Sequence, residues 1–140
     1  MTDPTLALQV LIGDRLAADP AITAHVEPVN IRAGAIRPEH LPAIVLAPAR
    51  VAVLGRAAGG QIVAEVRLFL RLWAPEEASP VAQAVAGAML AALMDAPAAS
   101  GFSIDEWDRP ELVWSRDPDP ARAYTKATVA VRAVLRWRAD

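Results

Sequence analysis

The chain contains no cysteine, only two histidines and only one lysine, Lys126, among its 14 basic residues. Without cysteine there is no thiol nucleophile, no cysteine-bound zinc and no iron–sulfur cluster. Two histidines, His25 and His40, are too few for a multi-histidine metal site or a histidine-rich proton relay. The sequence therefore predicts no catalytic residue, no metal site and no cofactor.

An excess of positive charge and a long apolar run are also missing. The 14 basic and 16 acidic residues give a formal net charge of -2, which creates no strong field for sequence-independent binding of nucleic acid. No apolar run reaches the roughly 18 residues that a membrane span needs, and the start Met1–Pro4 has neither the basic region nor the apolar core of a signal peptide. We therefore expect no membrane contact and a cytoplasmic site of synthesis.

What the chain does contain is apolar surface in small side chains. Of its 140 residues 54% are hydrophobic, but Phe, Trp and Tyr together make up only 5%. A chain of this length buries roughly two thirds of the surface that it exposes when unfolded, so it can build a core without disulfides or a structural metal. We predict a single domain over residues 1–140.

Two segments have the apolar spacing and the end signals of helices. Residues 4–18 form the first, with Asp3 and Pro4 at its start, and the pair Asp19-Pro20 then begins a short second turn that runs to Val26. Residues 80–95 form the other helix, with Ser79 as its N-cap.

Alternating or β-branched segments predict the strands. A short strand is expected at 29–32, before an irregular stretch at 33–42, and Asp117–Pro120 has the composition of a turn. The other expected strands are 43–54 with a kink at Pro48, 61–73, one on each side of Pro110 within 102–116, and 122–138.

The order of these elements predicts an α+β fold with two layers. Its strands are joined mostly by hairpins, so we expect an antiparallel sheet with a mixed edge and the two main helices packed on one face. The glycine-rich segment Gly55–Gly60 would be a mobile hairpin loop that projects from the core.

The outward faces of the two long strands carry the most informative side chains. Each of these faces mixes arginine with aromatic or aliphatic residues, so a protein interface and ordinary solvent exposure both remain open. Together with the hairpin, they supply the candidate interface residues Arg56, Gly59, Gly60, Glu65, Arg67, Phe69, Arg71, Trp73, Arg132 and Arg136.

An acidic cluster and His40 have a second possible interpretation. The acidic cluster Asp105, Glu106, Asp108 and Glu111 has the chemistry to bind a divalent cation, but its spacing matches no calcium loop, and a solvated loop is the simpler interpretation. His40 lies in an irregular loop in which the sequence places no serine or second histidine near it. A small ligand-binding domain that uses Asp105, Asp108 or His40 is therefore one alternative function.

Several segments also follow one another in a distinctive order. They are the helix through Leu8–Leu16, then Ala18–Val26, Leu41–Leu46 at the start of a strand, a helix over 82–93 that ends near Asp95, Ser100-Gly101-Phe102, and Arg116–Asp119 before the last strand. In this order they resemble the phage tail-completion or tail-terminator proteins of long-tailed phages and of phage-derived gene transfer agents.

The resemblance implies a structural virion protein without catalysis. It would form a ring of six subunits that ends the tail tube and joins it to the connector below the head, so its partners would be itself, the tail tube protein and the connector or stopper protein. DNA would pass through the lumen without specific binding. The protein would lie in the cytoplasm of the producing bacterium during assembly and afterwards in the particle tail, and a stopper or adaptor of the same junction is the neighbouring alternative.

Overall fold

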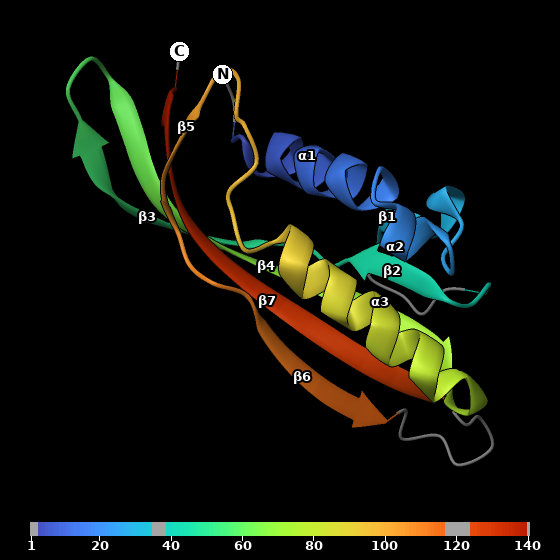
Figure 1. The fold of residues 1–140 in the computed structure, drawn as a ribbon. Helices are drawn as coiled ribbons and strands as arrows, with labels where there is room; N and C mark the ends of the chain where they lie inside the picture. Colours follow the sequence, from blue (N-terminus) through green and yellow to red (C-terminus); the bar gives the residue numbers. More distant parts are fainter. Residues whose placement is uncertain (1–2, 35–38, 117–123, 140) are drawn as a thin grey trace.

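The computed structural model describes residues 3–34, 39–116 and 124–139, and its ribbon is drawn in Figure 1. The helical elements are α1 (Thr5–Ala17), α2 (Pro20–Thr23), α3 (Ser79–Ala92) and two short 3-10 turns, η1 (Pro28–Asn30) and η2 (Glu76–Ala78). The strands are β1 (Ile31–Ala33), β2 (Ala43–Leu46), β3 (Arg50–Ala57), β4 (Gln61–Pro75), β5 (Ser103–Trp107), β6 (Glu111–Arg116) and β7 (Tyr124–Arg138).

Two long antiparallel strands, β4 and β7, form the centre of the sheet. They pair over their whole length, from Gln61 opposite Arg138 to Pro75 opposite Tyr124. The strands β2 and β3 share the other edge of β4, while β5 and β6 share the other edge of β7. The strand β1 runs parallel to β2 and every other pair is antiparallel, so the predicted α+β fold with a mixed edge is confirmed.

The segment that the sequence predicts as one strand over 43–54 is divided in two. The strand β2 ends at Leu46, and β3 begins at Arg50, with Pro48 between them. Since proline has no amide hydrogen, it cannot donate to the ladder along β4. The predicted kink at Pro48 is therefore present as a complete break in the strand.

Alternation along the two central strands separates a buried face from an outward face. The side chains that point towards the helices are almost all buried: Ala64, Val66, Leu68, Leu70, Leu72 and Ala74 of β4, and Ala127, Val129, Val131, Ala133, Leu135 and Trp137 of β7. The helices lie on this same side of the sheet (Figure 1). The expected packing of both main helices on one face is confirmed.

The helix α1 follows its predicted bounds closely and buries a single stripe. Leu8, Ile12 and Leu16, spaced four residues apart, are fully buried against the sheet and α3. Asp3 precedes the helix and accepts a hydrogen bond from the Thr5 amide at 2.9 Å. Asp19 likewise accepts from the Ala21 amide at 2.9 Å and caps α2, as its sequence predicts.

The helix α3 differs from its prediction at both ends. Ser79 is the first helical residue rather than the N-cap, because the turn η2 leads directly into the helix. The helix ends at Ala92, three residues early. Its last carbonyl groups accept bonds from other elements: Arg15 Nη1 donates to Ala92 O at 3.1 Å, and Trp107 Nε1 donates to Leu93 O at 2.9 Å.

The hairpin between β3 and β4 has a shorter turn than the predicted loop Gly55–Gly60. Residues 55–57 belong to β3, so the turn is confined to residues 58–60, where Gly59 and Gly60 have φ angles of 78° and 73°. Glycine is favoured in this left-handed region because it has no Cβ. The hairpin extends beyond the helical layer, as expected (Figure 1). The predicted turn Asp117–Pro120 and residues 122–123 of the predicted last strand lie outside the described residues.

Candidate assembly surface

The outward face of the central strands carries no helix (Figure 1). Cross-strand pairing brings residues of β4 next to residues of β7 on this face, with Arg67 opposite Arg132 and Trp73 opposite Lys126. Seven of the ten predicted interface residues share it: Glu65, Arg67, Phe69, Arg71, Trp73, Arg132 and Arg136. We call this set, together with Lys126, the outer face.

Glu65 is the centre of an ion-pair network on the outer face. Its carboxylate accepts from Arg132 Nε at 2.8 Å and from Arg67 Nε at 2.9 Å. The hydrogen bond from Arg132 is the main cause that lowers the pKa of Glu65, and the bond from Arg67 adds to it. The same contact with Glu65 raises the pKa of Arg132. Glu65 therefore links two arginines of neighbouring strands.

The predicted acidic cluster supplies further partners for these arginines. Asp108 lies 3.3 Å from Arg132 Nη1, and Asp105 accepts from Arg136 Nε at 3.0 Å, which raises the pKa of Arg136. Gln61 Oε1 also accepts from Arg136, at 3.0 Å. The carboxylates of Asp105 and Asp108 are thus engaged in ion pairs across the edge of the sheet.

The part of the chain that the structure describes holds no group of three acidic or histidine side chains placed to bind a metal ion. Sequence reasoning treated Asp105, Glu106, Asp108 and Glu111 as one cluster. The β5 ladder shifts register between Ile104 and Glu106, and its side chains are directed towards arginines of β7. The solvated-loop interpretation is wrong for Asp105, which lies in β5 and pairs with Arg136.

Aromatic and aliphatic carbon makes up the rest of the outer face. The ammonium group of Lys126 lies 5.2 Å from the centre of the Trp73 ring, a cation–π contact. Phe69 is half-buried beside Ala130 on the neighbouring strand. Such a mixture of arginine and aromatic side chains is typical of protein interfaces.

The three hairpin residues of the prediction do not share the outer face. Register pairs Arg56 with Ile62, which faces the helical side of the sheet, so Arg56 belongs to the opposite face. Gly59 and Gly60 form the turn, where a Cβ added to Gly59 would lie 3.4 Å from Arg138 Nη2. The predicted interface residues therefore form two separate surfaces, because the sheet places successive residues on opposite sides.

His40 has a neighbour that the sequence did not reveal. His25, which follows α2, lines the same hollow of about 590 Å³ as His40, together with Glu27 and Arg32. The 14 residues between the two histidines hide this proximity in the sequence.

Sequence reasoning also missed a set of exposed apolar side chains. Leu6 and Val10 of α1 are 68% and 55% exposed, and Val53 and Leu54 of β3 are 68% and 58% exposed. The helical signal for the first pair was present, because Leu6, Val10, Gly13 and Ala17 form a second stripe beside the buried one. For β3 no sign of exposure was present in the sequence, because β-branched residues are equally common in strands of the core.

The chain also matches a model of a known protein family. The family model described as "Tail completion protein gp17" matches residues 11–136, which is most of the chain. The chain belongs to the tail completion protein gp17 family. The resemblance inferred from the order of features is thereby confirmed.

The fold of this tail completion protein also has a solved counterpart. A chain from the structure titled "Virion of native gene transfer agent (GTA) particle" superposes with a TM-score of 0.69 and 21% sequence identity, and the match covers 92% of this chain and 94% of that one. No curated protein matches the sequence significantly. In the described part of the chain, none of the helices combines the length and the apolar character needed to cross a membrane.

Family membership makes this tail completion protein a structural component of a phage-type tail and of the virion. Its family is a structural one rather than one of enzymes. The ion pairs of the outer face join side chains of β4, β5 and β7. The ten interface residues remain a prediction.

Proposed function

We propose that this protein forms a closed ring of six subunits, which ends the tail tube and joins it to the connector or stopper protein at the head–tail junction. The observation that carries the proposal is the outer face, a sheet surface without helical cover on a chain of the tail completion family. A ring needs two different surfaces on each subunit, because its contacts are heterologous. The outer face and the hairpin surface, which is formed by Arg56, Gly59 and Gly60, are two such surfaces.

The part of the outer face that carries Arg132 and Arg136 is consistent with a wall beside passing DNA. Arg132 and Arg136 are paired with Glu65, Asp108 and Asp105, so these two guanidinium groups are largely neutralised within the subunit. Release of counterions by unpaired basic groups is what drives sequence-independent binding of DNA. In this proposal DNA passes the ring without specific contacts.

The outer face would contact the tube protein or a neighbouring subunit through Arg67, Arg71 and Trp73. Arg67 is half-exposed, with 54% of its side chain accessible, although one of its nitrogens donates to Glu65. Among the described residues Arg71 has no ion pair, so its charge is available to a partner. Both arginines therefore present donors for a carboxylate on another protein.

The first test is native mass spectrometry of the purified protein, alone and with its tail tube protein. The chain has a mass of 14.9 kDa, so a closed ring is expected at about 89 kDa. A stable monomer or dimer under both conditions would contradict the ring.

The second test reverses the charge of the outer face. The double variant Arg67→Glu with Arg71→Glu is expected to abolish assembly onto the tube while the circular dichroism spectrum stays unchanged. Arg116→Glu is the matched control, because Arg116 is an arginine of the opposite, helix-side face with 80% of its side chain exposed. Normal assembly of the double variant would remove the outer face from the proposal.

A further inference from the structure

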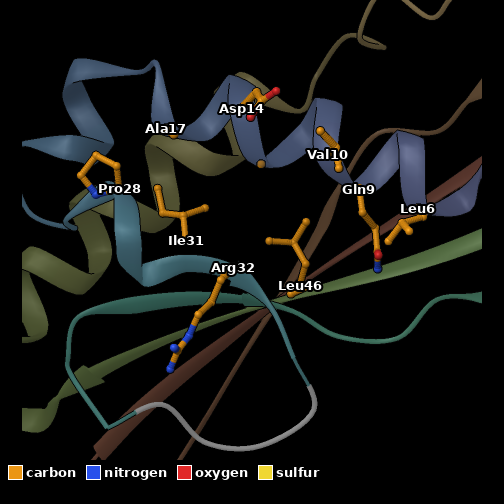
Figure 2. Close-up of a pocket in the computed structure, with 11 residues that line it drawn as sticks. Leu6, Gln9, Val10, Asp14, Ala17, Pro28, Ile31, Arg32 and Leu46 are labelled. Carbon is orange, nitrogen blue, oxygen red and sulfur yellow. The ribbon is translucent and has the colours of Figure 1, made fainter.

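A groove with an apolar floor runs between α1 and the sheet edge at β1. It has a volume of about 280 Å³, and Leu6, Val10, Ile31 and Leu46 are among its lining residues. Figure 2 shows Ile31 and Leu46 between the helix and the strands, with Leu6 and Val10 on the helix above them. Because Leu6 and Val10 are largely exposed, this surface is left open to water.

A second apolar surface lies on β3, at the other end of the sheet edge. Register pairs Val51 with Val66 and Val53 with Ala64, so both valines face the helical side of the sheet. The helices do not cover them: Val51 is 42% and Val53 68% exposed, and Leu54 at the neighbouring bulge is 58% exposed. We call Val51, Val53 and Leu54 the β3 strip. The β3 strip stands on the projecting hairpin (Figure 1), whereas the α1–β1 surface is a groove.

The charges around the two surfaces have opposite signs. Residues 50–60 contain Arg50 and Arg56 and no acidic residue. Residues 3–34 contain four carboxylates, Asp14 of the groove lining among them, and two arginines, of which Arg32 also lines the groove. The other arginine, Arg15, donates to the carbonyl groups of Ala92 and Asp95 at 3.1 and 2.7 Å and is already engaged. Asp14 and Arg32 balance one another within the groove, so the attraction is between the basic hairpin and the net acidic segment that carries the groove.

We propose that the α1–β1 groove receives the β3 strip of a second copy of this chain. The contact is heterologous, so each subunit uses its groove towards one neighbour and its hairpin towards the other, and repetition closes a ring. The inference rests on the proposed ring and adds to it the surfaces that hold neighbours together. In this contact the groove takes the place of the outer face as the partner of the hairpin, and the outer face is left for the tube or the connector.

Two glutamine variants test the contact without adding charge. The groove variant combines Leu6→Gln with Val10→Gln, and the strip variant combines Val53→Gln with Leu54→Gln. Each is expected to weaken subunit association by about tenfold or more for each residue changed and to leave only monomer. Val113→Gln is the matched control, because Val113 is 63% exposed on β6 and belongs to neither surface. Rings formed by both double variants would overturn the inference.

Mixing the two variants distinguishes this contact from a symmetric one. The groove variant still has an intact strip, and the strip variant still has an intact groove, so one contact forms and the mixture is expected to stop at a dimer. A contact of strip with strip, or of groove with groove, forms no such mixed dimer. A mixture that stays monomeric therefore overturns the inference.

Cross-linking tests the contact between groove and strip if subunits associate only on the tail tube. The chain has no cysteine, so Val10→Cys and Val53→Cys each introduce one unique thiol. A short bis-maleimide is expected to join the two variants when they are mixed, with or without the tube protein, and to join neither variant to itself. Assembly without this mixed product rejects the groove contact and keeps the ring. If the wild-type protein does not assemble and the mixed product is missing, both proposals fail.

Discussion

At the scale of single residues, Glu65 has the most connected position on the outer face. It binds Arg67 two residues away on its own strand and Arg132, which is 67 positions away in the sequence. The first contact follows from the alternation of one strand, but the second depends on the register between β4 and β7. A one-residue slip of that register would place Arg132 on the buried face of the sheet.

Replacing Glu65 is expected to make stability less sensitive to acid. The folded state lowers the pKa of Glu65, so its carboxylate stabilises the fold above the unfolded pKa of about 4.3, and this contribution is lost as the pH falls through the lower folded value. Glu65→Gln should therefore melt below the wild-type protein at pH 7, and the difference should shrink as the pH falls below about 4.3. Thermal melts between pH 3 and pH 7 measure the difference.

Glu106→Gln is the control for this measurement. Glu106 is 60% exposed, and its carboxylate lies 3.7 Å from the same arginine, Arg132, so its replacement should change the melting temperature little at any pH. A deficit of Glu65→Gln that is equally large at pH 3 and at pH 7 would show that Glu65 acts through packing and not through its charge.

At the scale of elements, the helix α1 has two apolar stripes with different roles. The stripe of Leu8, Ile12 and Leu16 is fully buried, whereas the stripe that contains Leu6 and Val10 lines the open groove. The centres of the two stripes lie about 130° apart around a helix, so a count of apolar positions that ignores their direction merges them. The width of the apolar surface is thus a sign that the helix has more than one partner.

Truncation of Leu8 and of Leu6 to alanine is expected to separate the roles of the two stripes. Leu8→Ala should lower the free energy of unfolding by about 2–5 kcal/mol, because it leaves a cavity in the core, whereas Leu6→Ala should change it by no more than about 0.5 kcal/mol. Urea titration of the monomer measures both values. Equal losses for the two variants would contradict the division of α1 into a core stripe and a groove stripe.

At the scale of the whole molecule, the sheet has one face covered by helices and one without them, and a hairpin that reaches past the helical layer (Figure 1). The two proposed contacts differ in chemistry. The outer face would bind through arginine side chains, while the groove and the β3 strip would meet through apolar surface. Salt therefore provides a means to separate them.

The two contacts are expected to respond to salt in opposite directions. Sodium chloride raised from 0.1 to 1 M shortens the screening length from about 10 to 3 Å and should weaken attachment through Arg67 and Arg71. Ammonium sulfate strengthens apolar contacts and should favour association of subunits with one another. Sedimentation velocity with and without the tube protein measures both effects. Attachment to the tube that does not change with sodium chloride would argue against an electrostatic outer face.

The sequence by itself determined most of the elements and the fold class. The 3.6-residue and two-residue periods predict α1, α3, β4 and β7, and the proline at position 48 predicts the interruption between β2 and β3. The order of helices and hairpins then predicts one helical layer on a mainly antiparallel sheet. These properties are readable because each depends on neighbours within a few positions of the chain.

Only the tertiary structure decided which residues share a surface. It divided the predicted interface by placing Arg56 on the helical side and Arg67 on the outer side, and it showed that Asp105 and Asp108 pair with arginines of β7. It also left the β3 strip exposed, because the helices end before the hairpin. Side-chain periodicity says which residues lie on the same face of one element, but contact between faces depends on the register and reach of elements far apart in the chain.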